Sequence, residues 1–220
     1  MKSSSVARDH RTLVAAASLV AGPLLMSIGD LFHPEESMNN AEQIAIVVDH
    51  ASSWYAAHLL LFVGILLSIP GFLALSNLTA HRSPAAGHAA RILVLVGTSA
   101  FASIFVGEML IGRYVTDGAN AIAGKALLDS MFSGPMVAAV GPAALAFFAG
   151  TAVFAIPLMR AGGGLRRVAV LYSAGALLIL AEILSAEVLL SQIGNIVIFL
   201  GGATAAWLLI RGEASLQGAG

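Results

Sequence analysis

Five residues that can ionise or hold a cation lie within or just beside apolar stretches of the sequence: Asp30, His33, His58, Glu108 and Glu182. Imidazole nitrogens and carboxylate oxygens bind Zn, Mn and Fe, and the same groups relay protons in membrane pumps and transporters. A charged side chain at the centre of a bilayer costs about 3 kcal/mol, so such residues usually face a bundle interior or a water-filled cavity. These five residues are therefore the candidates for a cation or metal site.

The spacing of these residues indicates which of them can act together. Asp30 and His33 are three residues apart, which places a carboxylate and an imidazole on one face of a helix. This Asp-x-x-His spacing imitates one half of the paired Glu-x-x-His pattern of di-metal bundles, but the chain has no second copy of it. Trp54, Tyr55 and His58 are also predicted to share a helical face, with the two aromatic rings above the imidazole.

Three further polar residues are secondary candidates: Tyr55, Glu187 and Asn195. Glu182 and Glu187 are five residues apart, which corresponds to about 140° around a helix. At most one of these two carboxylates is therefore expected to face a common site. Asn195 lies near the start of the last apolar stretch, at a depth similar to that of Glu182.

The composition determines which elements must position these residues. Hydrophobic residues make up 58% of the 220 residues, charged residues make up 10%, and the mean hydropathy is +0.90. A soluble domain has about a quarter charged residues, so this chain has too few to cover a globular surface. Six stretches are long and apolar enough to cross a bilayer as helices, at 12–32, 54–78, 92–111, 134–159, 168–190 and 193–210. The sequence therefore predicts one all-α integral membrane domain over 1–220, a bundle of six transmembrane helices.

The basic residues predict how the chain is oriented, because lysine and arginine are retained on the cytoplasmic side of a membrane. They concentrate before the first predicted helix, in the second and fourth loops, and after the last helix: Lys2, Arg8, Arg11, Arg82, Arg91, Arg160, Arg166, Arg167 and Arg211. Arg113 and Lys125 fall in the opposite set of loops. We therefore expect a multi-pass protein of the inner (cytoplasmic) membrane with both termini in the cytoplasm.

The two long external loops, 33–53 and 112–133, are predicted to contain one or two short amphipathic helices. Asn40 and Gln43 have the spacing of a capping box and are followed by apolar residues at helical spacing. A second helix is predicted over 121–132. Such helices either pack at the membrane interface or form a lid over a site beneath them.

The depth of the candidate residues is uneven. Counted from the predicted helix ends, all of them lie in the outer half of the bundle. The inner half contains essentially no ionisable side chain apart from arginines near its edge. This asymmetry predicts a polar site that opens to the external face.

These patterns favour a membrane protein that binds a cation, in particular divalent Zn, Mn or Fe, with His58 and Glu108 at the centre of the site. If the site is catalytic, a metal-bound water would attack a lipid-like substrate. The alternative is a proton- or cation-coupled transporter that uses Glu108, Glu182 and His58. Two further alternatives are the binding of an apolar ligand and a structural or accessory subunit, in which the polar residues only join helices by hydrogen bonds.

Several cofactors and partners are not indicated. The chain has no cysteine, which excludes thiolate metal sites, and only His58 is placed to ligate a haem between helices. No glycine-rich loop indicates a nucleotide or flavin, and no block of basic residues indicates a nucleic acid. The expected partners are membrane lipids and, through the small residues Gly201, Gly202, Ala205 and Ala206, either a neighbouring helix or a second copy of the chain.

Overall fold

The computed structural model describes residues 10–37, 39–116, 121–131, 135–185 and 187–215. In these ranges the chain forms eight helices: α1 (His10–Phe32), α2 (Asn40–Asp49), α3 (Ala51–Ala80), α4 (Pro84–Thr116), α5 (Ala121–Met131), α6 (Pro135–Ala161), α7 (Gly163–Ser185) and α8 (Val188–Arg211). Of these, α1, α3, α4, α6, α7 and α8 are long and apolar enough to span a membrane. The chain is therefore a multi-pass, all-helical membrane protein, and the predicted number of spans is confirmed.

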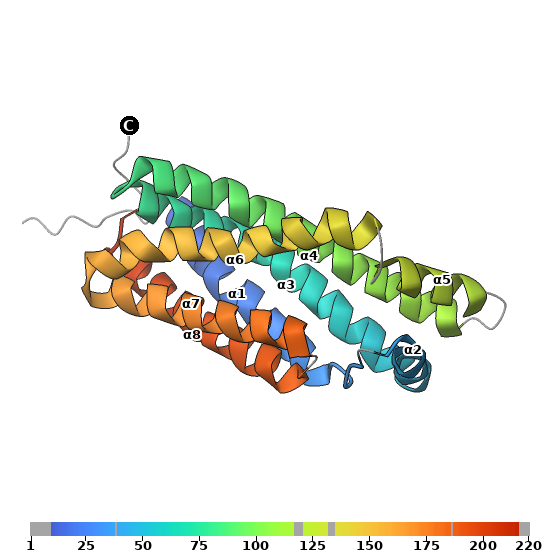
Figure 1. Cartoon of the computed structure of the whole chain (residues 1–220). Coiled ribbons are helices and arrows are strands. Elements are labelled where there is room, and N and C mark those ends of the chain that lie inside the picture. The colour runs from blue at the N-terminus through green and yellow to red at the C-terminus, as the bar shows by residue number, and fades with distance from the viewer. Residues whose placement is uncertain (1–9, 38, 117–120, 132–134, 186, 216–220) are drawn as a thin grey trace, which may run out of the picture.

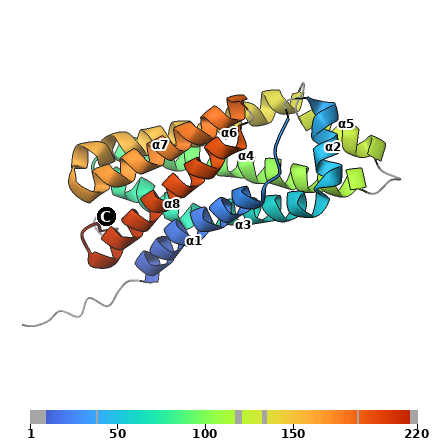
Figure 2. The same cartoon turned by 90° about the horizontal axis from the view of Figure 1, so that it is seen from below.

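The six long helices form a closed ring. α1 packs against α3, α3 against α4, and the series continues through α6, α7 and α8, which returns to α1. The short helices α2 and α5 lie together at one end of this bundle (Figures 1 and 2). We refer to this end as the site end, and to the opposite end, where α1 begins and α8 finishes, as the arginine end. Arg11, Arg82, Arg160, Arg166 and Arg211 lie at or next to helix termini at the arginine end.

The predicted boundary between the last two membrane helices is wrong. The sequence predicts helices over 168–190 and 193–210, but α7 ends just before Glu187 and α8 begins just after it. Glu187 therefore lies in the turn, as the N-cap residue of α8, and not inside a helix. The polar sequence near Ser191 does not interrupt α8, because the Ser191 hydroxyl donates a hydrogen bond to the backbone oxygen of Val188 at 2.9 Å.

Both of the predicted short helices are present, and α2 is capped one residue earlier than predicted. Asn39 is the N-cap residue, and its Oδ1 accepts the backbone N–H of Ala41 at 2.9 Å. The capping box predicted from Asn40 and Gln43 is therefore out of register by one residue. Gln43 instead binds the segment before the helix: its Oε1 accepts a hydrogen bond from the backbone N–H of Ser37 at 2.7 Å.

α2 covers the site end of α3 and α4. Its Val47 is fully buried, in a small hydrophobic cluster that includes Trp54 and Val115. This cluster exists because α4 continues well beyond the apolar stretch predicted at 92–111. α5 packs against the same extension of α4, and Phe132, the predicted last residue of this helix, lies outside the described residues.

Aromatic side chains fill the interior of the ring between His58 and the arginine end. Phe72 contacts Phe147 and Tyr172, with ring centroids 5.4 and 6.1 Å apart, and Phe154 contacts Tyr172 at 5.6 Å. All four side chains are buried. Phe72 lies fourteen residues after His58 in α3, which is about 21 Å along the helix. A thick apolar layer therefore separates the predicted polar site from the arginine end.

The ring closes through a close approach of α8 to α1. Pro23 has no N–H to bond the carbonyl of Leu19 within α1, and Gly202 lies against that carbonyl oxygen. A Cβ atom at Gly202 would lie only 1.9 Å from the Leu19 oxygen, whereas one at Gly201 would meet the ring of Tyr172 at 3.0 Å. Ala205 is also buried. These small residues therefore pack against neighbouring helices of the same chain.

Candidate functional site

His58 is the centre of the polar cluster at the site end. It lies in α3 and is 1% exposed, and its Nδ1 lies 2.7 Å from the carbonyl oxygen of Trp54, one turn earlier. Because a carbonyl oxygen can only accept, Nδ1 carries a proton. The other ring nitrogen, Nε2, lies 2.8 Å from Oε2 of Glu108 on α4 and 3.2 Å from Nε2 of His33. The structure thus brings His33, His58 and Glu108 together as predicted.

His33 is held just beyond the end of α1. Its Nδ1 lies 2.8 Å from the carbonyl oxygen of Pro34 and so also carries a proton. On its other side, Nε2 contacts His58 and lies 3.4 Å from Oε1 of Glu36. The side chains of His33 and Glu36 are 6% and 30% exposed. The contacts therefore run from a partly exposed carboxylate outside the membrane span to the buried Glu108.

The hydrogen bonds of the two histidines indicate how many protons this series of contacts needs. Both histidines use their Nδ1 protons on backbone carbonyls, so each Nε2 carries a proton only when that ring is cationic. The contacts of His58 with Glu108 and with His33 each need a proton between two acceptor atoms. One proton on Nε2 of His58 satisfies both contacts. Without it, two imidazole nitrogens and a carboxylate oxygen face one another with lone pairs only.

Trp54 fixes the geometry of this proton site. Its ring centroid lies 4.4 Å from that of His58 and 5.1 Å from that of His33. Its Nε1–H donates to the backbone oxygen of Glu108 at 2.9 Å, and Gly112 leaves room for the indole. The indole therefore ties α3 to α4 beside the shared proton. Tyr55, predicted to lie on the same face, is 47% exposed and lies on the outer surface of α3.

Asp30 makes a separate contact with α8. Asn195 donates through Nδ2 to Oδ2 of Asp30 at 2.6 Å, and Gln192 donates to the backbone oxygen of Asp30 at 3.0 Å. Asp30 and Asn195 are buried. The side-chain pairing predicted for Asp30 with His33 is replaced by a backbone hydrogen bond, from the His33 N–H to the Asp30 oxygen at 3.2 Å. Asp30 thus joins the first and last membrane helices.

Of the two carboxylates predicted at the end of the fifth span, one faces the cluster. Glu182 on α7 is partly buried and close enough to Asp30 and Glu108 for their charges to interact. Glu187 is exposed in the turn before α8. The expectation that at most one of these two residues faces a common site agrees with this arrangement.

Glu36 is the residue of the cluster that the sequence did not indicate. Burial raises the pKa of its carboxyl from the ordinary 4.5 to about 8, and the carboxylates of Glu108 and Glu182 contribute in the same direction. Burial also lowers the pKa of His33 from 6.5 to about 4, with help from the nearby His58. The spacing of Glu36 from His33, three residues, is the one signal that could have identified it.

Glu36→Gln is expected to change how stability depends on pH. Between pH 4.5 and 8 the folded chain keeps a proton on Glu36 that the unfolded chain releases, so stability falls as pH rises through this window. His33 contributes the opposite slope, but only from about pH 4 to 6.5. From pH 6.5 to 8 the thermal stability of the wild type in detergent should therefore fall relative to that of Glu36→Gln. The exposed Glu35→Gln is the control, and parallel curves for all three proteins would contradict the prediction.

The polar side chains around His58 contact one another two at a time. Among the residues that the structure describes, no group of three or more His, Asp or Glu side chains has the arrangement needed to hold a metal ion. Comparison with known proteins gives no relative: no family model, no curated protein and no solved structure matches this chain. The chemistry of the site therefore has to be inferred from its own geometry.

Proposed function

We propose that the protein is a proton-coupled membrane transporter in which His58, Glu108 and His33 hold the coupling proton. The observation that carries the proposal is the close approach of three atoms that can accept a proton: Nε2 of His58 lies 2.8 Å from Oε2 of Glu108 and 3.2 Å from Nε2 of His33. The three side chains come from α3, α4 and the segment after α1. Loss of the proton would replace two attractive contacts by repulsion between lone pairs, and would favour separation of these elements.

The proposed proton enters from the site end, which we place outside the cell because the arginines at the opposite end are typical of the cytoplasmic side. Glu36 is the partly exposed end of the chain of contacts, and Glu108 is its buried end. The aromatic layer around Phe72 and Tyr172 separates this chain from the arginine end. Under this proposal, the proton site of the described conformation is reached from outside the cell.

A second candidate function is the binding of a divalent metal, Zn, Mn or Fe, in place of the shared proton. Both histidines donate from Nδ1 to backbone carbonyls and turn Nε2 to the site, which is how metal-bound histidines are commonly held. The two Nε2 atoms are 3.2 Å apart, near the separation of about 3.3 Å for two nitrogens on a tetrahedral Zn ion. Glu108 and Glu36 would have to move toward a common point to complete such a site.

Charge movement after a pH jump tests the proposed function. The purified protein would be reconstituted into liposomes on a solid-supported membrane and acidified from the external side. We expect a transient inward charge displacement, because a proton moves from solution into the membrane to reach His58. A displacement no larger than that of protein-free liposomes would overturn the proposal. Glu187→Gln, which changes an exposed carboxylate outside the cluster, should behave like the wild type.

The same preparation separates the two candidates. Zn²⁺ would be added before the pH jump, without changing the starting pH. If the site takes protons alone, the acid-induced displacement should be unchanged. If the site binds the metal, Zn²⁺ should suppress the displacement, because the ion occupies the nitrogen that the proton needs. Thermal stabilisation by Zn²⁺ that persists in a variant with both His33→Gln and His58→Gln would show that Zn²⁺ binds elsewhere.

A further inference from the structure

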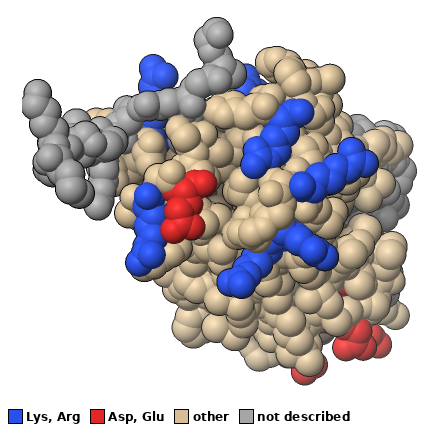
Figure 3. Space-filling model, turned by 90° about the vertical axis from the view of Figure 1, so that its left-hand side faces the viewer, with Lys and Arg blue, Asp and Glu red and all other residues tan. Residues whose placement is uncertain are grey.

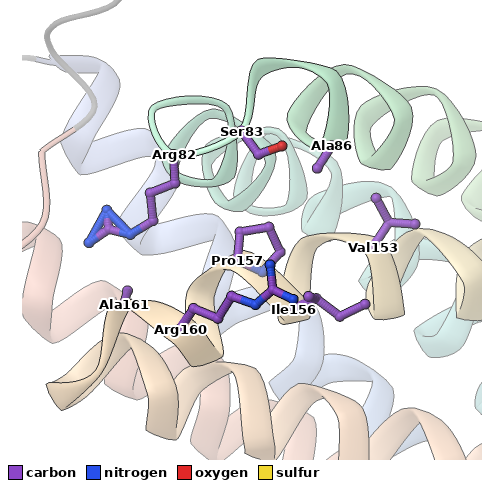
Figure 4. Close-up of a pocket in the computed structure, with 8 residues that line it drawn as sticks. All are labelled: Arg82, Ser83, Ala86, Val153, Ile156, Pro157, Arg160 and Ala161. Carbon is purple, nitrogen blue, oxygen red and sulfur yellow. The ribbon is translucent and has the colours of Figure 1, made fainter.

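A groove at the arginine end has a charged part and an apolar part. It has a volume of about 500 Å³ and lies between α6 and the corner that joins α3 to α4. Figure 4 shows the two walls, with the α3–α4 corner on one side and the last turns of α6 on the other. The residues that matter for its chemistry are Arg82, Ser83 and Ala86 on the first wall and Val153, Ile156 and Arg160 on the second.

The charged part of the groove is positive. Arg82 and Arg160 are exposed, and neither takes part in the ion pairs that the structure gives for the described residues. The N-terminus of α4 follows Ser83, and its first turn contains no acidic residue, so the positive end of the helix dipole is not neutralised there. Basic side chains gather over this end of the molecule (Figure 3). This part of the groove therefore favours an anion.

The apolar part continues along α6. This part is lined by Val153, Ile156 and Pro157. Ile156 is 47% exposed and lies in a helix that can span a membrane. The groove therefore opens on the side of the bundle that meets lipid. A ligand that fits both parts has an anionic head and a hydrocarbon chain. Inorganic phosphate would use the arginines and leave the apolar wall empty.

We propose that this groove binds an anionic phospholipid, with its phosphate between Arg82 and Arg160 and an acyl chain along Val153 and Ile156. The inner leaflet of a cell membrane is rich in anionic lipid, and each basic residue near its surface adds to the attraction. Bidentate hydrogen bonds from a guanidinium to phosphate oxygens give the arrangement its specificity. The bound lipid connects the α3–α4 corner to α6, which is the side of the ring opposite the α1–α8 contact.

Native mass spectrometry of the full chain in detergent tests this proposal, with phosphatidylglycerol, phosphatidylcholine and glycerol 3-phosphate as probes. We expect phosphatidylglycerol to bind in preference to phosphatidylcholine, and glycerol 3-phosphate not to displace it. The double variant Arg82→Gln with Arg160→Gln should bind phosphatidylglycerol about 25-fold more weakly, since each arginine contributes about fivefold. Equal displacement by glycerol 3-phosphate would show that the site takes a free phosphate and would overturn the lipid assignment.

Two further variants keep the test independent of total charge and of folding. Arg166→Gln with Arg167→Gln removes two exposed arginines from the neighbouring start of α7, outside the groove, and should keep the affinity of the wild type. Ala86→Trp retains both groove arginines and fills the space between the walls, and should block the lipid. Equal loss in the two double variants, or unchanged binding in Ala86→Trp, would overturn the proposal.

Discussion

Replacing Glu108 with Gln is expected to remove most of the pH-dependent change in the fluorescence of Trp54. The indole lies beside the imidazole of His58, with ring centroids 4.4 Å apart, and a cationic imidazole quenches indole fluorescence by accepting an electron from the excited ring. In the wild type the fluorescence should therefore rise as the shared proton leaves. A Gln side chain at position 108 has an N–H that can donate to Nε2 of His58 without any ionisation. The centre would then bind its proton at least about tenfold more weakly.

The chain allows this signal to be assigned to one residue. It contains two tryptophans, and the second, Trp207, is 54% exposed and stacks on Arg211 at the other end of α8. In a Trp207→Phe background, Trp54 is the only indole. We expect the fluorescence of this protein to be quenched as the pH is lowered and the imidazole takes up its proton, and the change to be much smaller when Glu108→Gln is added.

The choice of substitution and one control variant make the result decisive. Gln is preferred to Ala at position 108, because removing one partner of a buried pair costs about 3–5 kcal/mol and could unfold the protein. Glu187→Gln, in the exposed turn before α8, should leave the quenching of Trp54 unchanged. If Glu108→Gln kept the full pH dependence with its helical content intact, the proton would not be shared between Glu108 and His58.

Gly202→Ala is expected to cause a large loss of stability. The new Cβ atom would lie 1.9 Å from the backbone oxygen of Leu19 in α1, and a helix backbone cannot move aside as a side chain can. The contact between α8 and α1 would have to open along its length, and the Asn195–Asp30 hydrogen bond with it. Overpacking of this kind costs about 3 kcal/mol at the upper end of the usual range. Thermal unfolding in detergent measures it.

The neighbouring glycine provides the matched control. In Gly201→Ala the new Cβ would meet side-chain atoms of Tyr172 and Leu171 at 3.0–3.2 Å, which small movements can relieve. Both variants gain the same helix propensity, about 1 kcal/mol from Gly to Ala. We therefore expect Gly201→Ala to be close to neutral and Gly202→Ala to unfold at a much lower temperature. Equal effects would show that the approach of α8 to α1 does not limit stability.

The long membrane helices were predictable because the bilayer requires long apolar segments with internally bonded backbone. The meeting of His58 with Glu108 was expected for a related reason: both are buried in apolar helices at similar depth, and ionisable groups in that position tend to pair. Glu36 could not be singled out in this way. It lies outside the spans in a loop rich in acids, and its role depends on the path of the segment after His33, which local spacing does not determine.

Two other errors have identifiable causes. Glu187 was expected inside a helix because the residues on both sides of it are apolar and give no sign of the turn in which it lies. Asp30 was expected beside His33 from helical spacing. Its partner Asn195 is 165 residues away in the sequence, and the spacing within one helix cannot indicate a contact between the first span and the last.

The contact between α1 and α8 also has a consequence for biosynthesis. α1 is the first of these helices to leave the ribosome and α8 is the last, so the face of α1 that receives Gly202 has no partner on α8 until α8 has been synthesised. During this interval the carboxyl of Asp30 lacks the amide of Asn195, in surroundings where an unpaired polar group is costly. Assembly of the ring, and with it the positioning of the adjacent His33, is therefore completed only after the final helix has entered the membrane.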